Sequence, residues 1–406
     1  MQNFHNNMNN KEVVKKKVFV RTFGCQMNDR DSEAITGLFR QNGYTLTDDP
    51  KTADVILVNT CSVREHAEER EISFLGSLKK ISREGRRMKD EGREKLIPHP
   101  SSLIPRVIGL IGCMAKARGQ EIAKQMPHVN LICSPASEDR ILEYVEKIQK
   151  DGGRIIDLED RQRDEEFYQA PFNIDANHAQ VVISTGCSNH CTYCIVPSVR
   201  GELRLRKPED IVDEVKRNMD LGITRITLLG QNVNDYCFHP SNVNFIDLLK
   251  MAADINEIEE VDFMTSHPKN TSSELFNFMA GSHKIKKQLH LPIQSGSDKI
   301  LKAMNRGYRR EQYLKLAADY RHIVEGILGT DIIIGFPGES ERDFLDTVDI
   351  VKTVGFNYAY IFMYSPRPGT AAAKLADDVP LAEKKRRHAE LLALQKKISK
   401  GNITKY

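Results

Sequence analysis

The sequence lacks any apolar run that approaches the ~20 residues a helix needs to cross a membrane. Its start, Met1 to Asn10, is polar and has no apolar core of the kind found in signal peptides. We therefore expect a cytoplasmic protein with no membrane partner. Disulfides are rare in a reducing compartment, so the eight cysteines of the chain indicate metal binding or catalysis.

The chain also has little net charge, a formal +3 over 406 residues. A strongly basic composition is the usual footprint of nucleic-acid binding, so the total charge does not identify such a partner. Basic residues instead gather in four short groups that could contact phosphates, at residues 83–87, 200–207, 306–310 and 384–387. Solvated surface charge is the alternative for each group. We favour it for residues 83–87, and we favour a role at the active site for residues 200–206.

The length fits two domains, and both halves show the same alternation of secondary structure. Short β-branched runs alternate with helical patterns, which is typical of parallel strands joined by crossover helices. The first half has predicted strands at residues 18–22, 55–58, 107–111 and about 129–132, with helices at 31–41, 65–82, 119–126 and 138–150. The second half has predicted strands near 181–184, 225–229, 261–265, 288–291, 331–334 and 358–362, with helices at 208–220, 245–256, 297–304, 311–323, 339–354 and 381–397.

These patterns predict an α/β protein with an N-terminal open parallel-sheet domain followed by a partial (β/α)6 barrel. The predicted domains are a disordered tail at residues 1–16, the sheet domain at 17–157, a linker at 158–177, the barrel core at 178–398 and a short end at 399–406. Residues 83–105 are charged and then rich in proline and serine, and they have no periodic apolar face. We expect them to form an exposed excursion before the third strand.

Three cysteines in the first loop of the barrel form the pattern C-x3-C-x2-C, at Cys187, Cys191 and Cys194. Three thiolates at this spacing hold three irons of a four-iron cluster, so the fourth iron stays open for a small molecule. The alternative is a structural zinc site, which has four ligands that usually come from two pairs. No second CxxC pair follows within roughly the next forty residues. We expect the cluster at the carboxyl mouth of the barrel, where active sites gather.

Three further cysteines follow the first three strands of the sheet domain, at Cys25, Cys61 and Cys113. The carboxyl ends of parallel strands share one edge of an open sheet, which is where ligands bind. These residues therefore predict a second three-cysteine cluster site. The alternative is three buried cysteines that act as small hydrophobes. Cys133 and Cys237 have no such neighbours, and we expect both to be structural.

Polar residues follow the later barrel strands and could bind a methionine amine, ribose hydroxyls and adenine. Ordinary turn chemistry explains any one of them alone, but their common placement on one face favours a cofactor site. With Tyr193 of the cluster loop, the candidate cofactor-binding residues are Gln231, Asn232, Ser266, Gln294, Ser295, Asp331 and Gly335.

The cluster loop, with Tyr193 just before its last cysteine, resembles that of the radical S-adenosylmethionine (SAM) enzymes. From about residue 17 to residue 397 the chain resembles the methylthiotransferases, a radical SAM family with two clusters. The motifs Thr265-Ser-His-Pro268 and Tyr364-Ser-Pro-Arg-Pro-Gly-Thr370, together with residues 59–68, 230–234 and 290–298, most resemble the members that modify isopentenylated adenosine in tRNA.

The resemblance implies two [4Fe-4S] clusters and a mechanism. SAM would chelate the open iron at the cluster of Cys187, Cys191 and Cys194, and one electron would yield a 5′-deoxyadenosyl radical. The radical would remove hydrogen from C2 of N6-isopentenyl (dimethylallyl) adenosine, adjacent to the anticodon at position 37. A second SAM would methylate a sulfur on the auxiliary cluster of Cys25, Cys61 and Cys113. The implied partners are the tRNA anticodon stem-loop and an electron donor such as flavodoxin or ferredoxin.

Relatives of the same family modify threonylcarbamoyl-adenosine in tRNA or an aspartate of a ribosomal protein, and the motifs Thr265-Ser-His-Pro268 and Gln294-Ser-Gly-Ser297 argue against both. An Fe–S electron carrier or an RNA-binding module is the non-enzyme alternative, and neither would cleave SAM. The chain departs from the family pattern at Leu203 and Leu205, where the tRNA enzymes usually place an acid and a serine. The family normally continues into a small RNA-binding β-barrel domain, which residues 399–406 are not expected to supply.

Overall fold

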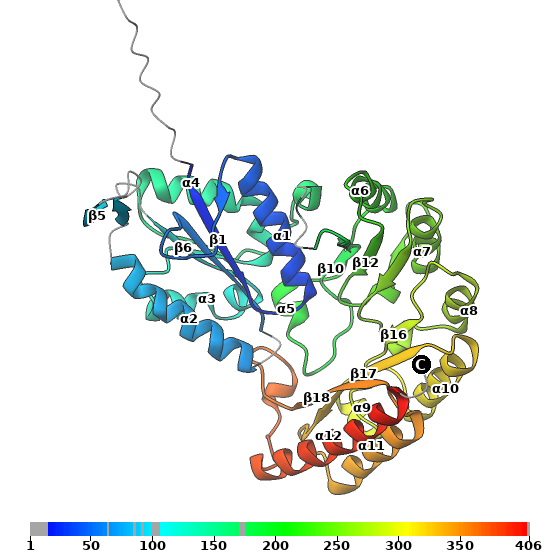
Figure 1. Ribbon diagram of the computed structural model, residues 1–406. Helices are drawn as coiled ribbons and strands as arrows, with labels where there is room; N and C mark the ends of the chain where they lie inside the picture. Colours follow the sequence, from blue (N-terminus) through cyan, green and yellow to red (C-terminus); the bar gives the residue numbers. More distant parts are fainter. Residues whose placement is uncertain are drawn as a thin grey trace, which may run out of the picture. The chain divides into compact units, whose positions relative to one another are not determined.

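The computed structural model describes residues 15–62, 65–83, 87–90, 93–98, 106–169, 172 and 175–403 (Figure 1). Residues 1–14 of the predicted tail, parts of the predicted excursion and linker, and residues 404–406 lie outside the described residues. The chain divides into two compact units, and each is described by itself. Unit 1 consists of Met1–Phe23, Ala34–Thr60 and His66–Phe172, and unit 2 consists of Gly24–Glu33, Cys61–Glu65 and Asn173–Tyr406.

Unit 1 is built on a six-stranded sheet in which every neighbouring pair is parallel. In spatial order the strands are β2 (Thr45–Leu46), β1 (Lys17–Thr22), β3 (Val55–Thr60), β6 (Val107–Gly112), β7 (Leu131–Cys133) and β8 (Ile155–Asp157). The central strands β3 and β6 are buried at every position. Such continuous apolar runs are typical of a parallel sheet that is covered on both faces. The predicted open parallel sheet is confirmed.

Helices cover both faces of this sheet (Figure 1). On one face, α2 (Glu65–Arg83) and α3 (Cys113–Gln125) pack through Leu75, Leu78, Met114 and Ile122 against β3 and β6. On the other face lie the C-terminal half of α1 (Gln26–Gln41) and α4 (Ile141–Asp151). The helix α4 buries residues 141, 144, 145 and 148, which is the spacing of one apolar helical stripe.

Two helices of the sheet domain begin earlier than predicted. Helix α1 starts at Gln26 instead of residue 31, because the backbone amides of Asn28 and Asp29 donate to the Cys25 carbonyl over 2.8 and 3.1 Å. Helix α3 starts at Cys113 instead of residue 119. Neither first turn carries an apolar period, so hydrophobic patterning could not detect it. The edge strands β2 and β8 were missed because they are only two and three residues long.

Unit 2 contains two three-stranded parallel sheets. One has the order β15-β12-β9, with β9 at His178–Val182, β12 at Arg225–Leu229 and β15 at Glu260–Phe263. The other has the order β16-β17-β18, at Gln288–His290, Ile327–Ile334 and Tyr358–Met363. An isolated parallel bridge joins Val261 of β15 to Ile285, in the segment that leads into β16 of the other sheet. The result is the predicted six-stranded partial barrel, which is confirmed.

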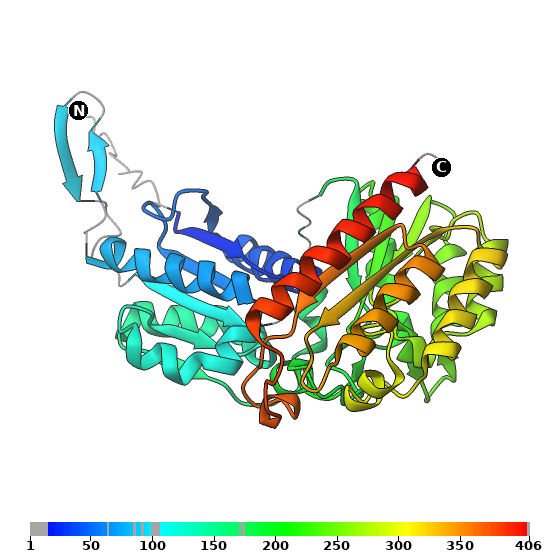
Figure 2. The same ribbon diagram turned by 90° about the horizontal axis from the view of Figure 1, so that it is seen from below.

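The helices of unit 2 lie outside the strands. They are α6 (Pro208–Asp220), α7 (Phe245–Ala253), α8 (Ser273–Gly281), α9 (Asp298–Ala303), α10 (Arg310–Ile323), α11 (Glu341–Val354) and α12 (Leu381–Ile403), preceded by the short α5 (Val196–Arg200). The sequence analysis did not predict α5 or α8. Helix α12 runs beside α11 and β18 and continues to Ile403, beyond its predicted end at residue 397 (Figures 1 and 2).

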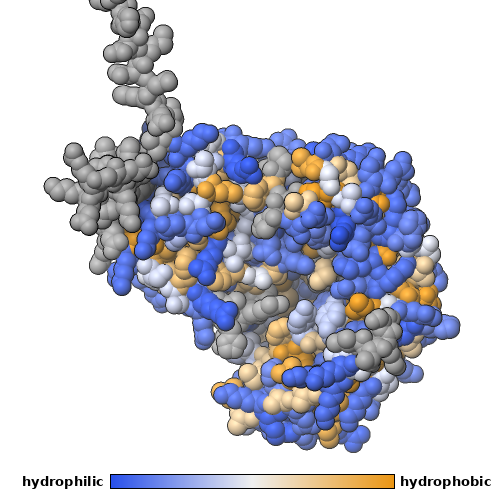
Figure 3. Space-filling view, in the orientation of Figure 1, coloured by the Kyte–Doolittle hydropathy of each residue, from blue (hydrophilic) through white to orange (hydrophobic). Residues whose placement is uncertain are grey.

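The predicted excursion at residues 83–105 contains an antiparallel strand pair, β4 (Arg87–Asp90) and β5 (Arg93–Pro98), which patterning did not predict. None of the described helices is both long enough and apolar enough to span a membrane. Hydrophilic residues dominate the face of the molecule seen in Figure 3, and apolar residues occur there in small groups.

Candidate active site

The cluster loop connects β10 (Ser184–Thr185) to α5 and carries Cys187, Cys191 and Cys194. Cys187 and Cys191 are buried, and Cys194 is half-buried. The backbone amide of Cys194 donates to the Cys191 carbonyl over 3.0 Å, which closes a tight turn between the last two cysteines. Burial raises the pKa of Cys187 and raises that of Cys194 to about 12. These thiols therefore need a strong local cation to become thiolates, and bound iron would supply one.

Glycine is required at the entry to the cluster loop. Gly186 has a φ of 70°, and a Cβ there would lie 2.0 Å from the backbone oxygen of Glu202. The amide of Cys187 donates to the Gly201 carbonyl over 3.3 Å, and β10 pairs with β11 (Arg204–Leu205). The close approach of these two backbones closes the cluster loop at its base.

The segment that follows α9 holds the other side of the cluster loop. The amide of Thr192 donates to the Met304 carbonyl of this segment over 3.1 Å, and its hydroxyl donates to the carbonyl of Ala303, the last residue of α9, over 2.9 Å. The side chain of Asn305 donates to the His190 carbonyl over 2.9 Å. Arg306 extends beneath the loop, with its Nη1 3.3 Å from Cys191 Sγ. The sequence analysis missed Arg306 as a neighbour of the cluster, because the two residues are 115 positions apart.

Several buried polar atoms at the strand ends have no hydrogen-bond partner. Among the described residues they are Ser184 Oγ, Asn232 Oδ1, Ser266 Oγ, His267 Nε2, His290 Nδ1 and Gln294 Oε1. Buried polar groups are normally paired, so a set of unpaired ones at one end of a barrel indicates a polar ligand. Donors and acceptors of this kind fit the amine, carboxylate and ribose hydroxyls of SAM.

Strained backbone positions these groups. Thr265 and Gln294, at the ends of β15 and β16, both have a φ of 71°. A positive φ is uncommon for non-glycine residues and is an outlier for a β-branched one, and such strain gathers at functional sites. The amide of Ser266 also donates to the His290 carbonyl over 3.3 Å, so the two loops are joined.

His267 is a further candidate site residue, which the sequence analysis included only as part of the motif Thr265-Ser-His-Pro268. Its Nδ1 accepts a hydrogen bond from the amide of Lys269 over 3.1 Å. Burial lowers the pKa of His267 to about 3, so the ring is neutral and its proton is assigned to Nε2. The unpaired Nε2–H is therefore a fixed donor at the end of β15.

The remaining candidate cofactor-binding residues differ in their burial and in their hydrogen-bond partners. The hydroxyl of Tyr193 lies 3.3 Å from Arg306 Nη1, and Gln231 is half-buried. Ser295 is fully buried and accepts from the amide of Ser297 over 3.2 Å, so it holds its own loop together. Asp331 Oδ2 lies 3.2 Å from His290 Nε2. Gly335 has a φ of 67° and donates its amide to a Glu339 carboxylate over 2.6 Å.

The three cysteines of the sheet domain follow neighbouring strands. The ends of β1, β3 and β6 are in register, with Thr22 opposite Asn59 and Thr60 opposite Gly112. Cys61 and Cys113 directly follow β3 and β6, and Cys25 follows β1. Within the described residues, no three Cys, His, Asp or Glu side chains are arranged as metal ligands. The case for the second cluster therefore rests on the strand positions.

We expect Cys25 of the metal-free protein to be unusually acidic. A hydrogen bond with Cys61 and the positive charge of Arg200 lower the pKa of Cys25 to about 6, although burial opposes them. Because thiolate is the reactive form, alkylation by iodoacetamide should rise through pH 6 instead of near the usual ~8.5. Labelling followed by mass spectrometry between pH 5 and 9 measures this.

Two comparisons control the labelling experiment. Cys61→Ala removes the hydrogen bond and should move the labelling curve of Cys25 to higher pH. Burial raises the pKa of Cys133 well above its usual value, so Cys133 should stay unlabelled in the folded protein. A Cys25 labelling curve centred near pH 8.5 would contradict the expectation.

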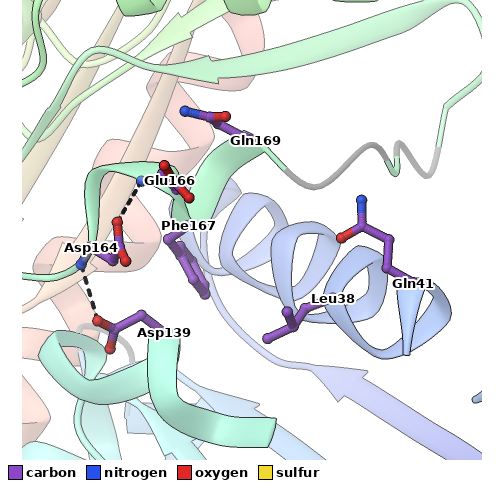
Figure 4. A pocket seen from close by; sticks show the side chains of 7 residues that line it. All are labelled: Leu38, Gln41, Asp139, Asp164, Glu166, Phe167 and Gln169. Carbon is purple, nitrogen blue, oxygen red and sulfur yellow. Dashed lines mark hydrogen bonds between the residues drawn. The ribbon is translucent and has the colours of Figure 1, made fainter. Parts of the chain in front are cut away.

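A separate cavity of about 410 Å³ lies in unit 1 (Figure 4). It is lined by α1, the 3-10 helix η2 (Pro135–Arg140) and the segment through η3 (Glu165–Gln169). Two of its carboxylates have backbone partners, because Asp139 accepts from the amide of Asp164 over 3.0 Å and Asp164 accepts from that of Glu166 over 2.9 Å. None of the predicted site residues lines it, and we assign it no ligand.

Comparison with known proteins agrees with this geometry. Residues 181–351 match the model of the Radical SAM superfamily, and residues 17–134 match the Uncharacterized protein family UPF0004. The chain is 42% identical over 379 residues to a tRNA-2-methylthio-N(6)-dimethylallyladenosine synthase of Clostridium novyi, covering 92% of this chain and 79% of that protein. The chain belongs to the tRNA-2-methylthio-N(6)-dimethylallyladenosine synthase family. A synthase of Syntrophotalea carbinolica is 36% identical over 95% of this chain and 85% of its own.

As a radical SAM enzyme, this member of the synthase family uses SAM and a [4Fe-4S] cluster. Solved structures support the fold alone. The radical SAM methyltransferase TsrM of Kitasatospora setae aligns with a TM-score of 0.59 at 13% identity, over 88% of this chain and 75% of that one. The radical SAM enzyme OxsB aligns with a TM-score of 0.56 at 10% identity, over 95% of this chain and 56% of that one.

The predicted phosphate contacts of two basic groups, residues 200–207 and 384–387, are wrong for their buried members. Arg200 pairs with Asp31 over 2.9 Å, Lys384 with Asp377 over 2.6 Å, and Arg387 with Glu339 over 2.8 Å. All three cations are less than one-tenth exposed, so they stabilise the fold instead of binding a polyanion. The side chains of residues 83–87 lie outside the described residues.

Proposed function

We propose that this protein adds a methylthio group to C2 of N6-dimethylallyladenosine at position 37 of tRNA, with SAM as methyl donor and radical source. The main support for this proposal is the sequence similarity to the synthase family, which extends along nearly the whole chain. The buried three-cysteine loop and the unpaired polar atoms around it support the same reaction.

The cluster held by Cys187, Cys191 and Cys194 would supply the one-electron chemistry that an unactivated aromatic C–H bond requires. The residues around the cluster would bind and orient a polar ligand. The Nε2–H of His267 and the side-chain oxygens of Ser266 and Gln294 are aligned by strained backbone and need no reorganisation to hold a polar ligand. Burial of the loop cysteines keeps water from the reacting atoms.

We assign an auxiliary [4Fe-4S] cluster to Cys25, Cys61 and Cys113, as the site that delivers the methylthio sulfur. The positions of the three cysteines after neighbouring strands and the lowered pKa of Cys25 support this assignment. A cytoplasmic flavodoxin or ferredoxin would donate the electrons.

An aromatic surface on β16 to β18 is suited to hold the substrate base. His290, Gly329 and Tyr358 share one register, and the rings of His290 and Tyr358 stack at 5.9 Å with an interplanar angle of 6°. A Cβ on Gly329 would lie 2.0 Å from the Tyr358 ring, so glycine makes room for it. Tyr360 is 52% exposed beside them. Leu328 and Ile332 pack into the core on the opposite face of β17, so this surface faces the inside of the barrel.

We expect Tyr360→Ala to raise the KM for dimethylallylated tRNA about tenfold, with a smaller change in kcat. Unstacked bases and their apolar substituents bind on aromatic side chains, which contributes ~1–3 kcal/mol per base. Steady-state kinetics with an anticodon stem-loop substrate measures the effect. Tyr360→Phe keeps the ring and should behave like the wild type, so an equal loss in both variants would argue against stacking.

The direct test is anaerobic reconstitution with iron and sulfide, followed by iron counting and mass spectrometry of nucleosides. The enzyme is incubated with SAM, a reductant and isopentenylated tRNA. We expect about eight irons per chain and a 2-methylthio product. About four irons would overturn the auxiliary cluster. A product from threonylcarbamoylated tRNA, with none from isopentenylated tRNA, would overturn the assigned substrate.

A further inference from the structure

Arg306 is a buried cation that has no carboxylate partner among the residues that the structure describes. It lies in the loop between α9 and α10 and is 4% exposed. Its Nη2 donates to the Pro292 carbonyl over 2.9 Å and its Nε to the Tyr308 hydroxyl over 3.0 Å. Its Nη1 lies 3.3 Å from both Cys191 Sγ and the Tyr193 hydroxyl. No ion pair joins it to any carboxylate among the described residues.

Among the described residues, four groups make polar contacts with the guanidinium, and one of them is the Cys191 thiol. The other contacts of the guanidinium are with neutral groups, the Tyr193 and Tyr308 hydroxyls and the Pro292 carbonyl. Burying an unpaired charge costs several kcal/mol, and a fold retains one when a counter-charge arrives. Cys191 is the group in contact that becomes anionic when it binds iron. The charge of Arg306 therefore fits a metal-loaded loop.

The backbone holds Arg306 in place. Asn305 and Gly307, on either side of it, have left-handed φ angles of 56° and 73°. Just before Arg306, Ala303 and Met304 accept hydrogen bonds from Thr192 of the cluster loop, and Asn305 donates one to the His190 carbonyl. A side chain fixed by its own backbone and by four polar contacts is preorganised and does not adjust to the loop.

We propose that Arg306 is a positioning residue that orients Cys191 toward the cluster and offsets the negative charge of its thiolate ligands. Reduction adds negative charge to a cluster, so a fixed cation beside a ligand sulfur raises the reduction potential. Arg306 thereby makes it easier to deliver the electron on which SAM cleavage depends. This inference rests on the cluster assignment of the proposed function.

The test compares reduction potentials in the full-length, anaerobically reconstituted protein. The readout is a redox titration of the electron paramagnetic resonance signal that changes when SAM is added, which separates this cluster from the auxiliary one. For Arg306→Gln we expect the ratio of reduced to oxidised cluster at a fixed potential to fall at least about tenfold, a shift of ~59 mV. Arg306→Lys keeps the charge and should recover most of that ratio. Lys302→Gln removes an exposed charge from α9 and should leave the ratio unchanged.

Each outcome decides the question. An Arg306→Gln variant with wild-type iron content and wild-type potential would overturn the proposal. Should Arg306→Gln lose its iron, retention of iron by Arg306→Lys supports the charge role, and loss of iron from both variants overturns it. A wild-type protein without a SAM-responsive signal would instead contradict the proposed function, since tRNA takes no part in this measurement.

Discussion

Replacing Cys191 with alanine is expected to abolish formation of 5′-deoxyadenosine. Cys191 is buried in the cluster loop, and with two ligands left the loop has no means of replacing it. Loss of a partner that only supports a ligand already costs ~10–100-fold, so removal of the ligand itself should exceed that. Chromatography of the products formed from SAM under reducing conditions measures the loss. Cys187→Ala and Cys194→Ala should behave in the same way.

Two controls separate the clusters in this experiment. Cys61→Ala should keep 5′-deoxyadenosine formation and lose the methylthio product, because Cys61 is assigned to the auxiliary cluster and not to the cluster that cleaves SAM. Cys237→Ala should change neither product, since Cys237 is exposed on the β13–β14 hairpin (Cys237–Phe238 and Val243–Asn244). Cleavage of SAM that survives in Cys191→Ala would remove the basis for the cluster assignment.

Gly186→Ala should prevent the cluster loop from closing. The new Cβ would lie 2.0 Å from the Glu202 oxygen and 2.5 Å from the Gly201 oxygen, and both are backbone atoms that cannot rotate away. We expect a loss of several kcal/mol of stability, beyond the ~1–2 kcal/mol that a left-handed alanine costs. Thermal unfolding and iron content after reconstitution measure the two consequences.

Gly201→Ala is the matched control, because Gly201 has a φ of 77° and a Cβ there meets nothing within 4 Å. It carries the backbone penalty of ~1–2 kcal/mol without the collision. We expect it to keep its iron while Gly186→Ala does not. Equal destabilisation by the two substitutions would show that backbone strain, and not the close approach to Glu202, requires glycine at position 186.

Strands with long apolar runs could be predicted from the sequence. Helical turns that carry no apolar period could not. The buried strands β3 and β6 were found because β-branched residues fill them. The first turn of α1 was missed because polar residues form most of it, and the first turn of α3, Cys113-Met-Ala-Lys116, was missed because its apolar run is too short to show a helical period. That error mattered for the site, since it hid the fact that Cys113 is the first residue of its helix and that Cys25 directly precedes its own.

The ion-pair partners of the basic groups could not be predicted from the sequence. The charge of these groups was visible in the sequence, but their partners were not. Arg387 meets Glu339, which is 48 positions away, and the buried pair leaves no cation for phosphate. Ionic pairing between distant residues depends on which helix faces meet, and local patterning does not report it.

The sequence by itself determined the cysteine chemistry, because the spacing C-x3-C-x2-C is local and brings three thiols into one loop whatever surrounds it. It also placed polar residues after successive parallel strands, and hence at the carboxyl edge of the sheet. Only the tertiary structure decided what surrounds those thiols. The unpaired atoms of Ser266 and His267, the aromatic surface of β16 to β18 and the contact of Arg306 with Cys191 all join segments far apart in the chain. Such contacts arise from tertiary packing, in which the desolvation cost of a buried charge is offset by its attraction to a partner from a distant part of the chain.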